Sequence, residues 1–502
     1  MDFIPMVLLL IFTAILSFLM ICKHTNRRHR ALPPGPRGLP IVGNLIHIDN
    51  ASPHLRLWEL SRQYGPLMSL RLGLRPALVV SSASFAKEVL TTYDPEFSGR
   101  PPFLSWKKLS YNGLDIACSN GHHWREIRKL CVVNLFSAKR VQSFSSIREE
   151  EVRRMIKKIQ TKSASSDKLV NLSALTMSFA NSVICRIGFG KSYEDDKSAA
   201  SDEATNFQRL LSEIQASFMQ FFFSDYIPFT SWVDRFRGLL SRLDKSFEES
   251  DKFYEQIIQD HVDDKRLKNE DREDIIDVML RLMKENSYST DLSYNHIKAV
   301  LMNIFVAGSD TTASTLVWAM TALMKHPRAL EKVKHEIKQV CGEKDFVNED
   351  DIEKLPYLRA VIKETWRMFP PAPLLVPRET IQRCNLFGYE IQPKTLVYIN
   401  AWAIGRDTDA WKEPEMFHPE RFLTSSIDFK GQHYELIPFG AGRRICPGIH
   451  MGTATVELAL ANLIHAFNWA LPPEMKKEDL DTEAAPGITT HKKIPLCLIA
   501  SG

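Results

Sequence analysis

The longest uncharged apolar run lies at the start of the chain, where residues 3–22 read FIPMVLLLIFTAILSFLMIC. As a helix, a run of this length spans about 30 Å, the thickness of the hydrocarbon core of a bilayer. Only Asp2 precedes it, and a basic cluster follows it at once, formed by Lys23, Arg27, Arg28 and Arg30. The run predicts a single transmembrane anchor, with the rest of the chain in the cytosol. A cleaved signal peptide is the alternative, but it would carry its basic residues before the run.

Residues 23–40, which follow the anchor, are first basic and then rich in proline, with four prolines from Pro33 to Pro40. Proline excludes helix and favours stiff extended backbone, so this segment is expected to be a hinge between anchor and body. No shift in composition marks a further boundary. Residues 41–502 are therefore expected to form one catalytic body.

Within the body, the hydrophobic pattern changes its period several times. Residues 67–81 alternate around a Gly/Pro break and predict a hairpin of short strands. The texture is helical from about 84 to 370, β-like from 372 to 400, helical again from 451 to 470, and typical of short strands from 480 to 500. The charged run Arg148–Arg154 predicts a solvent-exposed helix face with ion pairs. The expected fold class is mainly α with small β-sheets.

One long helix is expected near the middle of the chain, because Ser293–His326 contains no proline and Pro327 follows it. It is apolar on nearly all sides, so it must be buried. Its centre carries Gly308, Asp310 and Thr311, which a core helix does not favour. We expect a local break there, where the glycine admits a flat cofactor and the acid and hydroxyl relay protons to dioxygen. A kinked core helix is the alternative.

Composition narrows the function classes. The chain has 64 basic and 60 acidic residues and a net charge of +4, so no nucleic-acid partner is expected. Its eight cysteines are scattered and include no C-x-x-C pair. This arrangement favours a body in a reducing compartment, with most cysteines buried as small apolar side chains.

One cysteine has unusual surroundings. Cys446 follows two glycines, Gly440 and Gly442, and two arginines, Arg443 and Arg444, and it precedes an apolar helix. Positive charge, backbone N–H groups and a helix N-terminus lower the pKa of a thiol and favour the thiolate. One cysteine is too few for zinc or an iron–sulfur cluster but suits the axial position of a haem. A glycine-rich turn around a buried cysteine is the alternative.

Two further pairs stand at helical spacing. Glu364 and Arg367 are three residues apart, and the pattern alone reads as a surface ion pair. Trp124 and Arg128 are four residues apart on one helix face, and both side chains can donate to a carboxylate.

The residues Phe439-x-x-Gly442-x-Arg444-x-Cys446-x-Gly448 resemble the haem-binding signature of the cytochrome P450 family. The chain is also similar to the plant microsomal branch of that family, clan 71, in four runs: Pro33–Pro36, Val133–Ser137, Ala401–Ala403 and Pro438–Arg444. The resemblance covers almost the whole chain. It implies the P450 fold, with a long central helix over the haem and the cysteine loop below it, plus the N-terminal transmembrane helix.

The resemblance also implies roles for single residues. Cys446 would be the metal ligand to the iron of haem b, and Thr311 and Asp310 would deliver protons for cleavage of the O–O bond. The haem would be bound by a wider set: Cys446, Arg444, Trp124, Arg128, Arg378, Phe439, Gly442 and Gly448. Glu364, Arg367 and Arg421 would form a buried structural triad.

The substrate side is described by position. A substrate pocket is expected from Val306, Ala307, Leu375, Val376, Ile488 and Thr489, with residues 102–118 looping over the haem. These side chains are small or aliphatic and favour an apolar substrate, although each could be ordinary core. The aromatic stretch 218–232 is expected either to touch the bilayer as a lid or to pack in the core.

The resemblance implies an NADPH-dependent haem-thiolate monooxygenase that inserts one oxygen atom of O2 into an apolar plant specialised metabolite, such as a terpenoid, alkaloid, phenolic or oxime. The chain lacks a dinucleotide fingerprint, so the electrons would come from a separate NADPH–cytochrome P450 reductase, with cytochrome b5 as a second candidate donor. A basic patch around Lys129 is the expected docking site. The expected location is the endoplasmic reticulum membrane. Alternatives are an isomerase or dehydratase of the same fold, and a haem binder without enzymatic activity.

Overall fold

The computed structural model describes residues 32–49, 51–164, 168–192, 200–263, 273–285 and 291–501. The expected anchor at 3–22 and most of the basic part of the hinge lie outside this range. The α-helices are α2 (Pro53–Tyr64), α3 (Ala83–Leu90), α4 (Asp94–Phe97), α5 (Leu104–Leu109), α6 (Gly121–Asn134), α7 (Ala138–Ser143), α8 (Ser145–Ser163), α9 (Leu172–Phe189), α10 (Ala200–Met219), α11 (Ser231–Phe236), α12 (Leu239–Asp263), α13 (Ile275–Glu285), α14 (Tyr294–Lys325), α15 (Pro327–Cys341), α16 (Glu349–Ile352), α17 (Pro356–Met368), α18 (Ala401–Ile404) and α19 (Ile449–Ala466).

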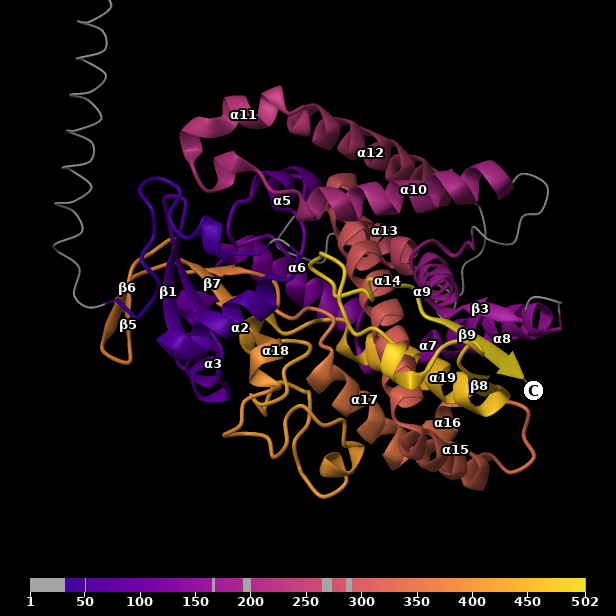
Figure 1. Ribbon diagram of the computed structural model, residues 1–502. Helices are drawn as coiled ribbons and strands as arrows, with labels where there is room; N and C mark the ends of the chain where they lie inside the picture. Colours follow the sequence, from indigo (N-terminus) through magenta and orange to yellow (C-terminus); the bar gives the residue numbers. More distant parts are fainter. Residues whose placement is uncertain are drawn as a thin grey trace, which may run out of the picture.

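The strands are short and form three sheets. They are β1 (Leu67–Leu72), β2 (Arg75–Val80), β3 (Leu169–Asn171), β4 (Arg378–Glu379), β5 (Cys384–Leu386), β6 (Tyr389–Ile391), β7 (Leu396–Ile399), β8 (Asn468–Ala470) and β9 (Cys497–Ser501). The largest sheet has the order β1-β2-β7-β4, the second β3-β9-β8, and the third is the hairpin β5-β6. Figure 1 shows the largest sheet at the left, with α2 and α3 beside it, and most of the long helices to its right.

The predicted hairpin at 67–81 is confirmed, since β1 pairs antiparallel with β2 from Leu67↔Val80 to Leu72↔Arg75. The β-like texture of 372–400 is confirmed by β4 to β7. The tail is less regular than expected, because 480–500 contributes only the beginning of β9 and an isolated bridge between Ala484 and Lys492. Parallel pairing of β2 with β7 joins the N-terminal hairpin to a strand from the last third of the chain.

The central helix α14 runs through the middle of the fold (Figure 1). Its bounds match the expectation, with Ser293 as the N-cap. The expected local break is absent, because α14 is continuous through residues 307–312. Gly308 also has a packing role: a Cβ there would lie 2.7 Å from Cδ1 of Ile184, so the glycine lets α9 approach α14. Both α9 and α14 are long and apolar enough to cross a membrane, but most of each is buried inside the fold.

The proline-rich segment lies against the body. Pro33 O accepts from Ser69 Oγ at 2.5 Å, and Pro34 O accepts from Ser69 N at 2.9 Å. A Cβ on Gly35 would overlap the carbonyl of Ser69, so glycine is required for this approach. The described end of the expected hinge is therefore bonded along β1.

The charged run on α8 is only partly the solvated face that the pattern predicts, because Glu150 and Arg153 are exposed but Arg148 and Glu151 are not. Arg148 is fully buried, and its Nε donates to Glu349 Oε1 at 2.6 Å. Glu151 is also buried and accepts from Arg186 at 2.8 Å. These partners lie far away in the sequence, so the local pattern could not reveal them.

Candidate active site

A cavity of about 300 Å³ lies between α14 and the loop that carries Cys446. Cys446 and Phe439 form part of one wall, and Ala307, Gly308 and Thr311 of α14 form part of another. The site therefore joins the two sequence features singled out above, which are more than a hundred residues apart.

The cysteine loop is fixed by backbone contacts. Cys446 N donates to Phe439 O at 2.9 Å, and Arg128 Nη2 donates to Ile445 O at 2.7 Å. Gly440 and Gly442 both have φ of +70°, the left-handed region that glycine adopts without strain. A Cβ on Gly442 would lie 2.3 Å from Leu90 O, so this glycine permits α3 to approach the loop. Gly442 packs there and is not part of the cavity wall, whereas Gly448 is.

The expectation that Arg443 and Arg444 lower the pKa of the Cys446 thiol is wrong. Burial raises the pKa of Cys446, although the Gly448 N–H and the Arg128 guanidinium act in the opposite direction. Arg443 is exposed, and Arg444 donates to backbone carbonyls. The cation that lowers the pKa of the thiol is thus Arg128, from α6. A thiol in such a place becomes a thiolate by binding a metal.

Four arginines gather at one end of the cavity: Arg100, Arg128, Arg378 and Arg444. Burial and the charges of Arg378 and Arg128 lower the pKa of Arg444 to about 9. Arg378 donates to Asp94 Oδ1 at 2.6 Å and to Ala441 O at 3.0 Å. Such a concentration of buried positive charge is costly unless an anionic group is bound there.

Trp124 stands within this cationic end without being part of the cavity wall. The guanidinium carbon of Arg444 lies 4.0 Å from the centre of its ring. Its indole Nε1 is buried and has no hydrogen-bond partner among the described residues. A buried N–H without an acceptor costs free energy, so this atom also indicates an absent anionic ligand.

On the opposite wall, the two proton-relay candidates point in different directions. Thr311 lines the cavity, and its Oγ1 donates to Ala307 O at 2.7 Å, as the sequence suggests. Asp310 is not part of the cavity wall. Its Oδ1 lies 2.6 Å from His491 Nε2. The structure therefore places the hydroxyl in the cavity and the acid behind it.

Behind the cysteine loop, Glu364, Arg367 and Arg421 come together. Arg367 donates twice to Glu364, at 2.7 and 2.8 Å, and Arg421 Nε donates to Glu364 Oε1 at 3.1 Å. Glu364 and Arg367 are fully buried, so this is no surface ion pair. The three side chains join α17 to the segment before the cysteine loop.

Comparison with known proteins decides the family. The family model for cytochrome P450 matches residues 33–498. The chain is a cytochrome P450. It is 46% identical over 489 residues to strychnine-11-hydroxylase of Strychnos nux-vomica, with 96% of this chain and 94% of that protein covered. It is 45% identical to cytochrome P450 71B26 of Arabidopsis thaliana, with 99% of each covered. The latter similarity confirms the resemblance to the plant 71 group.

The fold is confirmed independently. A solved zebra fish cytochrome P450 with progesterone matches with a TM-score of 0.77 at 27% identity, covering 90% of this chain and 99% of that chain. The P450 is accordingly a haem-thiolate monooxygenase whose cofactor is haem b. Its cavity fits that cofactor: a cysteine on one wall, a glycine-bearing helix on the other, four arginines and an unpaired indole N–H at one end.

Half of the expected substrate pocket lies on the cavity wall of the P450. Ala307, Leu375 and Val376 line it. Val306 and Ile488 instead pack against hydrophobic clusters, and Thr489 is buried outside the wall. The loop at 102–118 contributes Ile116 and Ala117, and α9 contributes three further apolar residues, Ala180, Val183 and Ile184.

Sequence reasoning missed Arg100, Asn303 and His491. Arg100 is buried in the cavity wall and donates to Ala117 O, Val376 O and Pro377 O at 2.6–2.9 Å. Asn303 accepts from the backbone of Ile116 and Ala117 at 3.1 and 3.0 Å. Asn303 is found by counting four residues back from Ala307 and eight from Thr311 on one helix face. Nothing in the local sequence identifies Arg100 or His491.

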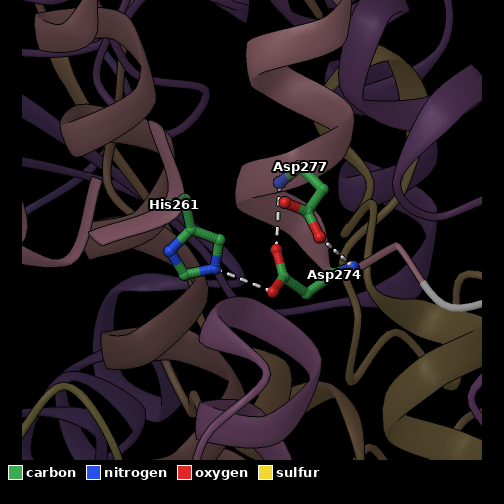
Figure 2. Close-up of side chains that lie close together, drawn as sticks. All are labelled: His261, Asp274 and Asp277. Atoms are coloured by element: carbon green, nitrogen blue, oxygen red, sulfur yellow. Dashed lines mark hydrogen bonds and ion pairs between the residues drawn. The ribbon is translucent and has the colours of Figure 1, made fainter. Parts of the chain in front are cut away.

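A second group of titratable side chains lies away from the cavity (Figure 2). His261 Nε2 lies 2.9 Å from Asp274 Oδ2, and Asp277 N donates to Asp274 Oδ1 at 2.9 Å. His261 Nδ1 lies 2.7 Å from Ile257 O, so it must donate there. Burial lowers the pKa of His261, but the hydrogen bond and charge of Asp274, with the Ile257 carbonyl and the charge of Asp277, together raise it overall. The imidazole is therefore a cation without a free lone pair, and the group is an ion pair between α12 and α13.

Proposed function

We propose that this P450 hydroxylates an apolar plant specialised metabolite in its cavity. The observation that carries the proposal is the lining above the cysteine, where aliphatic side chains from α9, α14 and the 372–376 loop surround Thr311. A relative of similar sequence is named for hydroxylating strychnine. That name also favours oxygen insertion over the alternatives of isomerisation, dehydration or haem binding alone.

For the cofactor, Cys446 is proposed as the iron ligand. When bound, the haem supplies the redox chemistry that activates O2 with two electrons. Arg128, Arg444 and the Trp124 N–H are proposed to hold the propionates, since they gather at one end of the cavity. Arg378 is proposed to contribute positive charge at the same end of the cavity, while its Nη1 donates to Asp94. Phe439, Gly442 and Gly448 keep the cysteine loop in place.

Thr311 and Asp310 are proposed to supply protons. The Thr311 hydroxyl faces the cavity and orients water next to the oxygen site. Asp310 holds negative charge behind it, on the adjacent position of α14. Two protons are consumed for every oxygen atom inserted, so a route from solvent is required.

The electron donor is proposed to be NADPH–cytochrome P450 reductase, with cytochrome b5 as an alternative donor. Arg125 and Lys129 are exposed on α6, the helix that also carries Arg128, and the apolar Val133 is 56% exposed beside them. A mixed basic and apolar face suits an acidic protein partner. Lys129→Glu should raise the KM for reductase several-fold at low salt, and an unchanged KM would contradict the docking site.

We place the protein in the endoplasmic reticulum membrane, with the anchor at 3–22, the hinge at 23–40 and the catalytic body at 41–502 on the cytosolic side. The aromatic stretch divides in the structure: Phe222 is buried, whereas Phe229 and Trp232 are 58% and 68% exposed. Phe236 on α11 is 89% exposed nearby. These exposed aromatics are proposed to touch the bilayer. Full-length protein in plant microsomes should resist carbonate extraction, and its body should be open to added protease.

The test of function uses the full-length protein in microsomes with added reductase. Reduction under CO should give the absorbance band of a thiolate-ligated haem, and Cys446→Ala should lose it. Cys497→Ala, in β9 and outside the cavity, is the matched control. A panel of apolar metabolites including strychnine should then yield a product 16 mass units heavier, dependent on NADPH and O2. A thiolate band without any oxygenated product across a broad panel would favour the isomerase alternative.

A further inference from the structure

The Asp310 side chain lies outside the cavity wall, where its Oδ1 accepts from the imidazole of His491. His491 Nε2 lies 2.6 Å from Asp310 Oδ1, and the carboxylate can only accept, so His491 donates. Thr311, the next residue, faces the cavity. The acid thus stands between the oxygen-side hydroxyl and the histidine.

The position of His491 is fixed by the segment that carries it. The carbonyl of Thr490 accepts two hydrogen bonds from α14, from Ser314 Oγ and Trp318 Nε1, each at 2.7 Å. Thr490 N and Oγ1 donate to Pro371 O and Pro370 O at 2.8 and 2.9 Å. All of these groups are buried, so the segment is tightly joined to α14 one turn below Asp310.

The imidazole also reaches solvent. Its side chain is 34% exposed, whereas that of Asp310 is 15% exposed. The lysines that follow it are engaged elsewhere, Lys492 with Asp481 at 3.3 Å and Lys493 with Glu483 at 2.7 Å. The histidine is therefore the group that connects the carboxylate to the surface.

We propose that His491 is a positioning residue for proton supply. Its Nε2–H orients the Asp310 carboxylate and holds it ready to accept a proton from solvent and pass it toward Thr311. In this transfer the Asp310 carboxylate takes one proton from the solvent pool and gives it to Thr311 Oγ1, while Thr311 releases its own hydroxyl proton into the cavity, so both groups are restored after each proton delivered. The proposal rests on the relay role proposed above for Asp310 and Thr311.

The test compares His491→Phe, His491→Gln, Asp310→Asn and the double variant as full-length holoenzymes with reductase. The readouts are the rate of NADPH oxidation, the share of electrons recovered as hydrogen peroxide, and the ratio of rates in H2O and D2O. His491→Phe should slow NADPH oxidation at least about tenfold and enlarge the solvent isotope effect. His491→Gln keeps an N–H donor and should restore most of the rate. The double variant should be no slower than Asp310→Asn.

Two controls separate this role from general damage. His465→Phe alters another partly exposed histidine, which lies away from the cavity and whose Nε2 is 2.7 Å from the backbone carbonyl of Lys344. This variant should leave all readouts unchanged. Thermal unfolding should be measured for wild type, Asp310→Asn, His491→Phe and the double variant. The shifts of the two single variants should not add up to that of the double variant, because the two side chains are in contact.

The outcomes discriminate between the two proposals. A slow Asp310→Asn enzyme beside a normal His491→Phe enzyme overturns the role of His491 and leaves the relay intact. Normal rates in both overturn the relay itself. Loss in His491→Phe that glutamine does not restore overturns positioning by the N–H.

Discussion

Glu364 and Arg367 form a fully buried bidentate ion pair, with Nε and Nη2 of the guanidinium 2.7 and 2.8 Å from the two carboxylate oxygens. The remaining donors of Arg367 reach the carbonyls of Gly405, Pro414 and Met416. The charge is thereby surrounded by acceptors that come from the segments after α18.

Replacing one partner of this pair should be severe. Arg367→Ala leaves the buried Glu364 carboxylate, among the described residues, with Arg421 and the backbone N–H of His418 as its remaining partners. The free energy of unfolding should therefore fall by about 3–5 kcal/mol. Chemical unfolding of the holoenzyme measures this directly. Arg56→Ala breaks the exposed Arg56–Glu59 pair and should change the unfolding free energy by less than about 1 kcal/mol. Equal losses of unfolding free energy in Arg367→Ala and Arg56→Ala would show that burial does not strengthen the contribution of the Glu364–Arg367 pair to stability.

Trp124→Phe separates binding of the cofactor from stability of the fold. The indole N–H has no partner in the part of the chain that the structure describes, so its removal should not weaken packing. If the N–H meets a propionate, the variant should lose haem about tenfold faster to a competing haem-binding protein, the equivalent of about 1.4 kcal/mol.

Trp469→Phe is the matched control for this test. Its Nε1 donates to Leu463 O at 2.7 Å, away from the cavity. This variant should lower thermal stability without changing the rate of haem loss. Identical haem-loss rates in the two variants would remove Trp124 from the cofactor set.

These contacts show what a sequence can and cannot reveal. The hairpin at 67–81 and the helix at 293–326 follow from local periodicity, and the structure confirms both. The pairing of Glu364 with Arg367 is also local, but its burial is not, because the protecting carbonyls lie some forty residues further on. Resemblance to a family supplied what the local pattern could not.

The contacts that the sequence did not predict have one physical cause. Arg148 and Glu349 are bonded across 201 residues, and Asp310 and His491 across 181. Arg148, Glu349 and His491 look like ordinary polar surface positions in their own segments, and the buried helix around Asp310 does not reveal its partner. Only the topology, which joins the C-terminal segment to α14, turns them into buried or functional partners. The thiol of Cys446 follows the same logic, since the cation that lowers its pKa comes from α6 and not from its own loop.

Gly442 allows a sharper test of the cysteine loop, because the chain contains a glycine with the same backbone angle. Gly442 and Gly238 both have φ of +70°, but a Cβ on Gly442 would lie 2.3 Å from Leu90 O, whereas nothing lies within 4 Å of one on Gly238. Gly238→Ala should cost about 1–2 kcal/mol of backbone strain alone. Gly442→Ala should cost about 1–3 kcal/mol more and reduce haem content. Similar unfolding free energies for the two would mean that α3 can move away from the loop.

The ion pair between α12 and α13 predicts a dependence of stability on pH. Burial lowers the pKa of His261, but the hydrogen bond and charge of Asp274, the Ile257 carbonyl and the charge of Asp277 together outweigh burial and raise the pKa in the folded protein above its ordinary value of 6.5. A raised pKa means that the folded state binds the proton more tightly than the unfolded state does. The stabilisation is therefore complete below about pH 6.5 and is lost as pH rises through the folded pKa.

His261→Gln should remove this dependence. Wild type and variant should differ most in unfolding free energy near pH 6, by about 1–3 kcal/mol, and the difference should shrink toward pH 9. Thermal unfolding at several pH values measures the difference, and subtraction of the two curves cancels the groups that both proteins share. Because the pair lies away from the cavity, the CO spectrum should be the same in both. A difference that grows with pH would mean that His261 is neutral in the folded protein, and its Nε2 lone pair would then be free to bind a metal.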